Sequence, residues 1–251
     1  MKRWLYMGMW VLASQAALAA DIPAVLEWSQ RVELSTPVSG VVQTVEAGVG
    51  QRVKKGQVLL ALDAGRYRAK VAESQAAVAR ARAEVADAKR NLDRVQELYN
   101  RTVISTSELD QAKLRHARAA AMLGEAQGHL ELDRKNLADA VLRAPFDGVV
   151  VARKAEPGQT VAAGLKPQTL LVLAKSGEML ARARLYDNQI DRLKPGQSVT
   201  VSVAGKDYAG RVKTLGLEPV TEKNEVTYPV DVVFPVREQL RAGTPATLKL
   251  Q

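Results

Sequence analysis

Residues 37–56 read PVSGVVQTVEAGVGQRVKKG, and residues 145–164 read PFDGVVVARKAEPGQTVAAG. The two stretches match at a fixed offset of 108 residues. The shared residues include Pro37 and Pro145, Gly40 and Gly148, Val41 and Val149, Val42 and Val150, Gly50 and Gly158, and Gln51 and Gln159. β-Branched residues between glycine turns are typical of short antiparallel strands joined by tight hairpins. The chain therefore carries one small β motif twice, and the segment between the copies decides the fold.

A seven-residue repeat fills the segment between the two copies, where residues 38–144 contain no proline. The repeat predicts a seam, the line of residues along which two packed helices touch. In its first part the seam residues fall at two alternating positions: Val71, Val78, Val85, Leu92 and Tyr99, with Ser74, Ala81, Ala88 and Val95. After a break at residues 100–104 the repeat resumes: Leu109, His116, Leu123, Leu130 and Leu137, with Ala112, Ala119, Ala126, Asp133 and Ala140. This heptad pattern predicts two coiled-coil helices, and the short break between them predicts an antiparallel hairpin.

The region after residue 175 has a third pattern. Short apolar stretches alternate with glycine and proline turns, and they predict strands at 180–185, 198–203, 210–215, 226–234 and 247–250. Several short strands with such turns are typical of a small antiparallel barrel.

The first twenty residues are predicted to be a signal peptide. Lys2 and Arg3 precede the apolar run 4–12, and Ala17-Leu18-Ala19 provides a small-residue cleavage signal. The apolar run is short for a permanent membrane span, although retention as an anchor stays an alternative. The chain has no cysteine, which excludes a disulfide scaffold and thiolate metal ligands.

Composition and spacing exclude several classes of function. The formal net charge is +9, but basic and acidic residues are interspersed, and aromatic residues make up only 4%. Neither feature favours a nucleic-acid partner. His116 and His129 are 13 residues apart, which is not the one-turn spacing of a helical metal pair. We therefore expect no enzyme activity, no catalytic residues, no metal site and no cofactor.

The order of these segments resembles the periplasmic adaptors, the HlyD-like family also called membrane fusion proteins. The resemblance covers roughly residues 30–250. It implies an α+β fold of several modules: a split lipoyl-like β-sandwich with an inserted antiparallel coiled-coil hairpin, followed by a small antiparallel β-barrel. The expected domains are the signal peptide 1–20, a lead-in strand or linker 21–36, the lipoyl-like halves 37–63 and 144–174, the hairpin 64–143 and the barrel 175–251.

A true lipoyl or biotinyl carrier needs an acceptor lysine at the turn that joins its two halves. Here Leu62-Asp-Ala-Gly65 stands at that place, whereas Lys54 and Lys55 come earlier in the chain. The resemblance therefore extends to the carrier fold and not to the carrier's cofactor.

A finer motif lies at the predicted hairpin tip, in the stretch 94–105, RVQELYNRTVIS. In adaptors that dock onto TolC-type channels, an arginine is followed by a leucine four residues later and a serine seven residues after that. Arg94, Leu98 and Ser105 have this spacing, so the resemblance implies that they contact the channel. Ser105 and Glu108 also match a helix capping box, so Ser105 has a structural reading as well.

The resemblance implies a non-catalytic adaptor of a tripartite efflux system. It would bridge an RND-type pump of the inner membrane and a TolC-type outer-membrane channel, with several copies, commonly six, in the assembly. An adaptor of an ABC-type exporter or type I secretion system is the alternative, and a stand-alone coiled-coil binding protein is an alternative of another class. A periplasmic location follows, with association with the inner membrane left open.

Many adaptors continue into a membrane-proximal domain built from both chain ends. Since few residues precede Pro37 and none follows Gln251, we expect that domain to be absent and the barrel to contact the pump. Cargo and oligomeric state in isolation have no signal in the sequence.

Overall fold

The computed structural model describes residues 21–164, 166–222 and 225–249. The predicted signal peptide lies outside these residues. The described chain divides into two compact units, residues 31–174 and residues 21–30 with 175–249. Among the described residues, none of the helices combines the length and the hydrophobicity that a membrane span needs.

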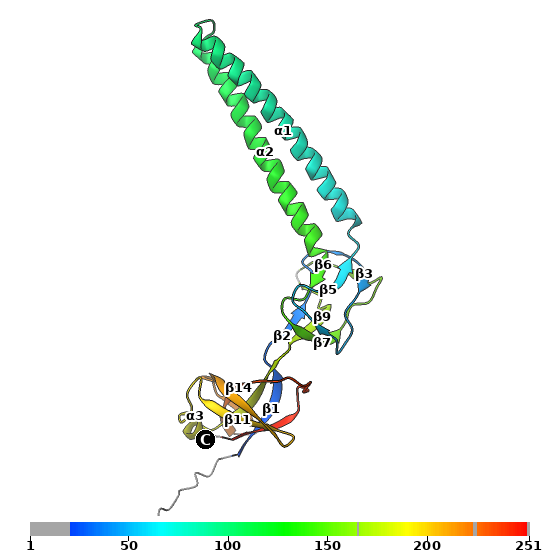
Figure 1. Cartoon of the computed structure of the whole chain (residues 1–251), viewed down its shortest axis with the longest axis vertical. Coiled ribbons are helices and arrows are strands. Elements are labelled where there is room, and N and C mark those ends of the chain that lie inside the picture. The colour runs from blue at the N-terminus through cyan, green and yellow to red at the C-terminus, as the bar shows by residue number, and fades with distance from the viewer. Residues whose placement is uncertain (1–20, 165, 223–224, 250–251) are drawn as a thin grey trace, which may run out of the picture. The chain divides into compact units, whose positions relative to one another are not determined.

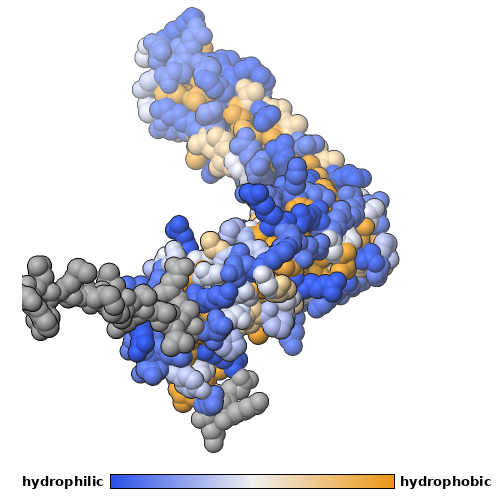
Figure 2. Space-filling model, turned by 60° about the horizontal axis from the view of Figure 1, so that its bottom comes forward, coloured by the Kyte–Doolittle hydropathy of each residue, from blue (hydrophilic) through white to orange (hydrophobic). Residues whose placement is uncertain are grey.

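The predicted coiled-coil hairpin is confirmed. Helix α1 runs from Gly65 to Asn100 and α2 from Thr106 to Asp139, and the two pack side by side along their length (Figure 1). The seam positions of the heptad repeat are buried or half-buried, except for Tyr99, which is 36% exposed near the tip. On the face shown in Figure 2 the surface of the hairpin is largely hydrophilic, with some hydrophobic residues between the hydrophilic ones.

The two copies of the β motif form two four-stranded sheets of the same design. One sheet has the order β2-β9-β7-β4 and the other β6-β5-β3-β8. The strands before the hairpin are β2 (Arg31–Leu34), β3 (Gly40–Val45), β4 (Arg52–Val53) and β5 (Val58–Leu62). Those after it are β6 (Val141–Arg143), β7 (Gly148–Arg153), β8 (Thr160–Val161) and β9 (Leu171–Lys175).

Each sheet takes strands from both halves of the sequence. Replacing every strand by its counterpart in the other copy (β2 by β6, β9 by β5, β7 by β3, β4 by β8) converts one sheet order into the other. The sequence repeat is therefore a structural pseudo-symmetry. Apolar side chains from both halves fill one core between the sheets, including Val42, Leu60, Val150 and Leu171.

A single turn design recurs at four places. A glycine with positive φ is followed by a glutamine, whose side-chain Oε1 accepts the backbone N–H three residues earlier at 2.8–3.0 Å. The Gly-Gln pairs are Gly50-Gln51, Gly56-Gln57, Gly158-Gln159 and Gly196-Gln197. Positive φ favours glycine because it has no Cβ to clash with the backbone, which explains why both copies have glycine at the matched positions Gly50 and Gly158.

Both ends of the hairpin stand on neighbouring strands. Ala61 of β5 is in register with Val141 of β6, and the N–H of Leu62 donates to the carbonyl of Ala140 at 2.8 Å. Tyr67, in the first turn of α1, is buried, and its hydroxyl donates to the carbonyl of Ser39 at 2.6 Å. The hairpin is thereby fixed to the sandwich at its base.

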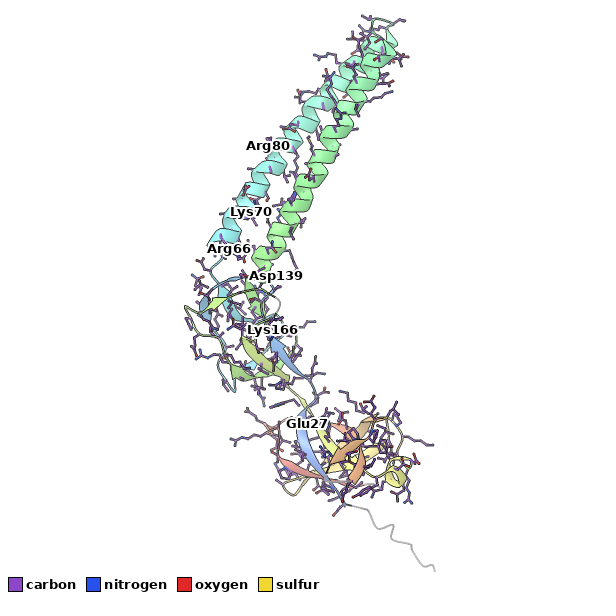
Figure 3. All side chains as sticks on the ribbon, turned by 180° about the vertical axis from the view of Figure 1, so that it is seen from behind. Glu27, Arg66, Lys70, Arg80, Asp139 and Lys166 are labelled. Atoms are coloured by element: carbon purple, nitrogen blue, oxygen red, sulfur yellow. The ribbon has the colours of Figure 1, made fainter. Side chains whose placement is uncertain are left out.

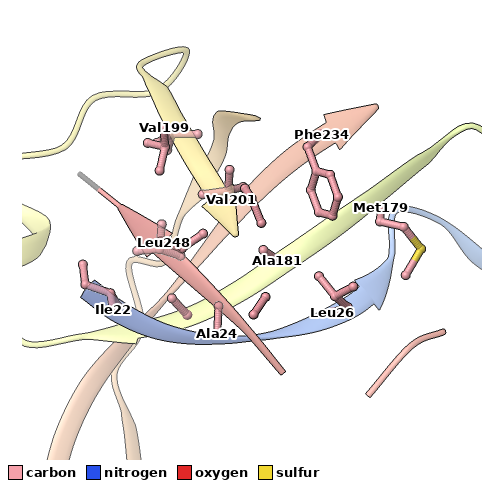
Figure 4. Close-up of a cluster of buried hydrophobic side chains, with 14 of the residues drawn as sticks. Ile22, Ala24, Leu26, Met179, Ala181, Val199, Val201, Phe234 and Leu248 are labelled. Atoms are coloured by element: carbon pink, nitrogen blue, oxygen red, sulfur yellow. The ribbon is translucent and has the colours of Figure 1, made fainter. Parts of the chain in front are cut away.

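The second unit is a closed barrel of six strands in the order β10-β1-β15-β11-β12-β14, closed by pairing of β14 with β10. A seventh strand, β13 (Val220–Glu222), pairs with the start of β14. The barrel strands are β1 (Asp21–Trp28), β10 (Glu178–Leu185), β11 (Ser198–Val203), β12 (Lys206–Leu215), β14 (Glu225–Pro235) and β15 (Pro245–Lys249), with the short helix α3 (Asp187–Ile190) after β10. Inward-facing residues such as Leu26, Val201, Phe234 and Leu248 form its core (Figure 4).

Segment 21–36, for which we expected a lead-in strand or linker, contributes a strand to each unit. Its first part is β1, which pairs with β10 and β15 inside the barrel. Its second part is β2, which pairs with β9 of the sandwich. The inward residues Ile22, Ala24 and Leu26 are at most 6% exposed, so burial of this alternating face holds β1 in the barrel.

Candidate docking site at the hairpin tip

The chain reverses direction at the tip in a loop of five residues, 101–105, between α1 and α2. Carbonyls in the last turn of α1 accept hydrogen bonds from the loop, and that of Leu98 accepts the N–H groups of Arg101 and Val103 at 3.2 and 3.1 Å. Thr102 has a φ of 60° and its N–H donates to the carbonyl of Tyr99 at 2.9 Å. The tip is thus a closed turn with its backbone largely hydrogen-bonded.

Ser105 is the N-cap of α2. Its Oγ accepts the backbone N–H of Glu108 at 3.3 Å, and the Glu108 carboxylate accepts the N–H of Ser105 at 3.0 Å. The capping box predicted from the sequence is therefore present. Ser105 is nevertheless exposed, so its cap role leaves the residue accessible at the tip.

Arg94 and Leu98 lie one helical turn apart on α1, so they share one face of the helix. Arg94 is exposed, and its guanidinium donates to Oδ1 of Asn91 at 2.7 Å. Leu98 is half-buried beside the seam. The face combines the N–H donors of the Arg94 guanidinium with the apolar side chain of Leu98. Charged donors and apolar side chains are both common in contact surfaces between proteins.

One apolar residue of the tip was missed by the sequence analysis. Val103 is 65% exposed in the loop, and Tyr99 is 36% exposed at the end of α1. The signal that could have identified it is an apolar β-branched residue inside the break of the heptad repeat, where no position is buried between the helices. Exposed apolar side chains at the end of a mostly polar rod add apolar area to a docking surface.

The histidines do not form a metal site. His116 is half-buried at its seam position, and His129 is exposed, with Nε2 at 3.9 Å from the Glu125 carboxylate. Among the described residues, no group of three or more histidine, aspartate and glutamate side chains is placed to hold a metal ion. The side chains at the tip can offer contact and charge complementarity to a partner.

Comparisons with known proteins agree on the architecture. The family model of the CzcB-like barrel-sandwich hybrid domain matches residues 30–174. A curated macrolide export protein, MacA of Yersinia pestis, is 28% identical over 232 residues. The alignment covers 86% of this chain and 62% of MacA, so this chain spans about three-fifths of that relative.

Two solved structures share the fold. A MacA–MexA chimera carrying the MexA α-hairpin domain of Pseudomonas aeruginosa superposes with a TM-score of 0.69 at 23% identity, covering 91% of this chain and 79% of the chimera. The membrane fusion protein Spr0693 of Streptococcus pneumoniae R6 gives a TM-score of 0.71 at 14% identity, covering 93% of this chain and 99% of Spr0693. Each superposition covers more than nine-tenths of this chain, so it includes residues of both compact units.

Proposed function

Because this chain belongs to the CzcB-like barrel-sandwich hybrid family, and with it to the periplasmic adaptors or membrane fusion proteins, we propose that it bridges an inner-membrane transporter and a TolC-type outer-membrane channel. The observation that carries the proposal is the exposed tip of a long hairpin. There Arg94 and Leu98 share a face, and Val103 adds apolar area.

The proposed mechanism is structural. The hairpin is a rod of more than thirty residues per helix, or about 50 Å at roughly 1.5 Å per residue. It would hold the docking face away from the sandwich, in the periplasm. Several copies acting together, six as the resemblance implies, would gain affinity by multivalency, so that each tip contact can be weak.

We propose an RND-type pump as the inner-membrane partner and the barrel as its contact. An adaptor of an ABC-type exporter or type I secretion system is the second candidate. The similarity to a macrolide export protein supports a role in export and leaves the cargo of this chain open. Identification of the transporter that copurifies with the crosslinked adaptor decides between the two classes.

The test uses the absence of cysteine from the chain. A single cysteine at the exposed Asn100 should crosslink to an outer-membrane channel in cells. Leu98→Asp in the same chain should abolish the crosslink, because it replaces the apolar side chain of the docking face by a charged one. Leu114→Asp is the matched control, since Leu114 is 49% exposed on α2 outside the tip.

A crosslink that survives Leu98→Asp would contradict docking through this face. Absence of any channel crosslink, with the protein folded and abundant, would instead favour the stand-alone coiled-coil binding protein.

A further inference from the structure

A groove runs along one side of the hairpin, immediately below the proposed docking face. Its volume is about 840 Å³, and both helices line it: Arg80, Ala83, Glu84, Asp87, Ala88, Arg90, Asn91 and Arg94 from α1, and Arg115 from α2. Arg80 lies on α1 above Arg66 and Lys70, toward the tip (Figure 3). The groove therefore joins Arg94 of the docking motif to residues that the motif does not include.

The groove has an excess of positive charge. Arginine supplies four of its lining residues, and acids supply two, Glu84 and Asp87. Arg90 is paired with Asp87 at 3.1 Å, whereas Arg80 and Arg115 make no ion pair or hydrogen bond with the described residues. Two guanidinium groups of the groove thus have no acidic partner, and Arg94 is hydrogen-bonded to the neutral amide of Asn91.

Carboxylates are the natural occupants of such a groove. A guanidinium presents a planar fork of N–H donors that fits a carboxylate in a bidentate manner. Arg94 and Arg115 come from different helices, so an elongated partner lying in the groove could contact both. A helix with acidic residues on one face fits this arrangement.

A second copy of the hairpin is a poor source of those carboxylates. Among the described residues, the acids of the two helices are already engaged within their own hairpin, apart from Glu84, which lines the groove itself, and Glu125, whose carboxylate lies 3.9 Å from Nε2 of His129, beyond hydrogen-bond distance. The engaged carboxylates are those of Glu73, Asp87, Asp93, Glu97, Glu108, Asp110, Glu131, Asp133 and Asp139. In a neighbouring copy these carboxylates would already share their charge with a donor of their own hairpin, so a new contact gains less than one with an unpaired acid of a different protein.

We infer that this cationic groove binds acidic side chains on the helical end of the outer-membrane channel, with Arg115 acting beside Arg94. The inference rests on the proposed function and extends it in two ways. It adds a residue from α2 to a docking motif that lies on α1 and in the loop. It also assigns the partner surface a chemical character, that of a helix carrying aspartate or glutamate.

The experiment places a photoreactive benzoylphenylalanine at Gln111 in the full-length protein and illuminates intact cells. Gln111 is exposed and lies one helical turn from Arg115, so the probe reaches the groove without replacing a lining residue. The expected product joins Gln111 to a channel segment with an aspartate or glutamate within about one helical turn of the linked residue. Arg115→Glu should lower its yield at least about tenfold, and Arg115→Lys by less, because lysine keeps the charge and loses the fork.

Lys113→Glu is the matched control. It makes the same change of charge two residues away, on a side of α2 that does not face the groove, and should leave the yield unchanged. Circular dichroism of each purified variant checks that the hairpin is intact.

The outcomes separate this inference from the proposed function. If the cysteine at Asn100 captures a channel, docking stands. The groove inference is then overturned by capture of a second copy of this chain at Gln111, by no capture there, or by equal effects of Arg115→Glu and Lys113→Glu. If neither probe captures a channel, both proposals fall.

Discussion

The hydroxyl of Ser74 donates a hydrogen bond to the carboxylate of Asp133 across the hairpin. The two residues occupy facing seam positions of α1 and α2, and Ser74 is only 7% exposed. Each is a polar residue at a position where the heptad repeat otherwise has apolar or small side chains. A polar pair in a coiled-coil seam favours the one stagger of the helices that lets its members meet. The pair therefore fixes the register of α1 against α2.

Ser74→Ala should destabilise the hairpin by about 1 kcal/mol, because it leaves the Asp133 carboxylate facing a methyl group. Adding Asp133→Ala should recover part of the loss, since no unpaired polar group then remains in the seam. Urea denaturation followed by circular dichroism measures both effects. Glu73→Ala, which removes an exposed ion pair next to Ser74, should change stability by no more than about 0.5 kcal/mol. Equal losses of stability in Ser74→Ala and Glu73→Ala would show that the hydrogen bond between Ser74 and Asp133 contributes nothing.

The two copies of the β motif should differ in their tolerance of one methyl group. A Cβ on Gly148 would lie 2.4 Å from the carbonyl oxygen of Ala174, which is backbone and cannot move aside alone. A Cβ on its counterpart Gly40 would meet the Leu62 side chain at 3.4 Å, an ordinary contact. We expect Gly148→Ala to cost about 3 kcal/mol and Gly40→Ala less than about 1 kcal/mol, as measured by thermal unfolding. Similar melting temperatures for the two variants would refute this asymmetry.

Ser105 allows its structural and docking roles to be separated. Ser105→Ala removes the N-cap acceptor of α2 and should cost about 1 kcal/mol, while Ser105→Asp keeps an acceptor and the stability. If Ser105 acts through its cap, Ser105→Asp retains the channel crosslink from Asn100. Loss of the crosslink in a stable Ser105→Asp protein would instead indicate direct contact between the serine and the channel.

The barrel should lose stability in acid partly through Glu238. Hydrogen bonds from the Tyr208 hydroxyl and the Lys206 ammonium hold the pKa of the Glu238 carboxyl below its ordinary value. A lowered folded-state pKa adds stability above the unfolded pKa of about 4.3, and that stability is lost as pH falls through the folded-state pKa.

Unfolding of the barrel from about pH 6 to about pH 3, followed by the fluorescence of Trp28, measures this dependence. Glu238→Gln should flatten the curve over that range, and Glu218→Gln, at an exposed loop position, should not. A Glu238→Gln curve that parallels the parent chain would show that the carboxylate makes no such contribution.

The hairpin and the split sandwich were predictable because their signals are local and repeated. A seam residue every three or four positions is enough to identify α1 and α2, and the break at residues 100–104 identifies the tip. The matched glycines of the repeat predicted the paired β halves for a similar reason. Positive φ at Gly50 and at Gly158 imposes the same residue on both copies.

Other features depend on partners far away in the sequence. Strand β1 pairs with β10 and with β15, more than 150 residues later in the chain, so its own pattern could not show to which unit it belongs. The Ser74–Asp133 bond and the groove of Arg94 and Arg115 depend on the stagger of the two helices. A repeat shared by both helices is compatible with several staggers, so neither feature could be deduced from it.

The two ends of the hairpin at its base are joined by a hydrogen bond, in which the N–H of Leu62 donates to the carbonyl of Ala140 at 2.8 Å. Removing or adding seven residues in α1 together with seven opposite them in α2 would return each seam to the same face. Such a paired change would alter the reach of the tip by about 10 Å and leave every strand of the sandwich in place. An unpaired single insertion would instead rotate the rest of one helix by about 100° and disrupt its seam. Hairpin length can therefore change during evolution in paired steps of one heptad, without any change in the sandwich. Such steps would fit the same fold to periplasmic spaces of different width.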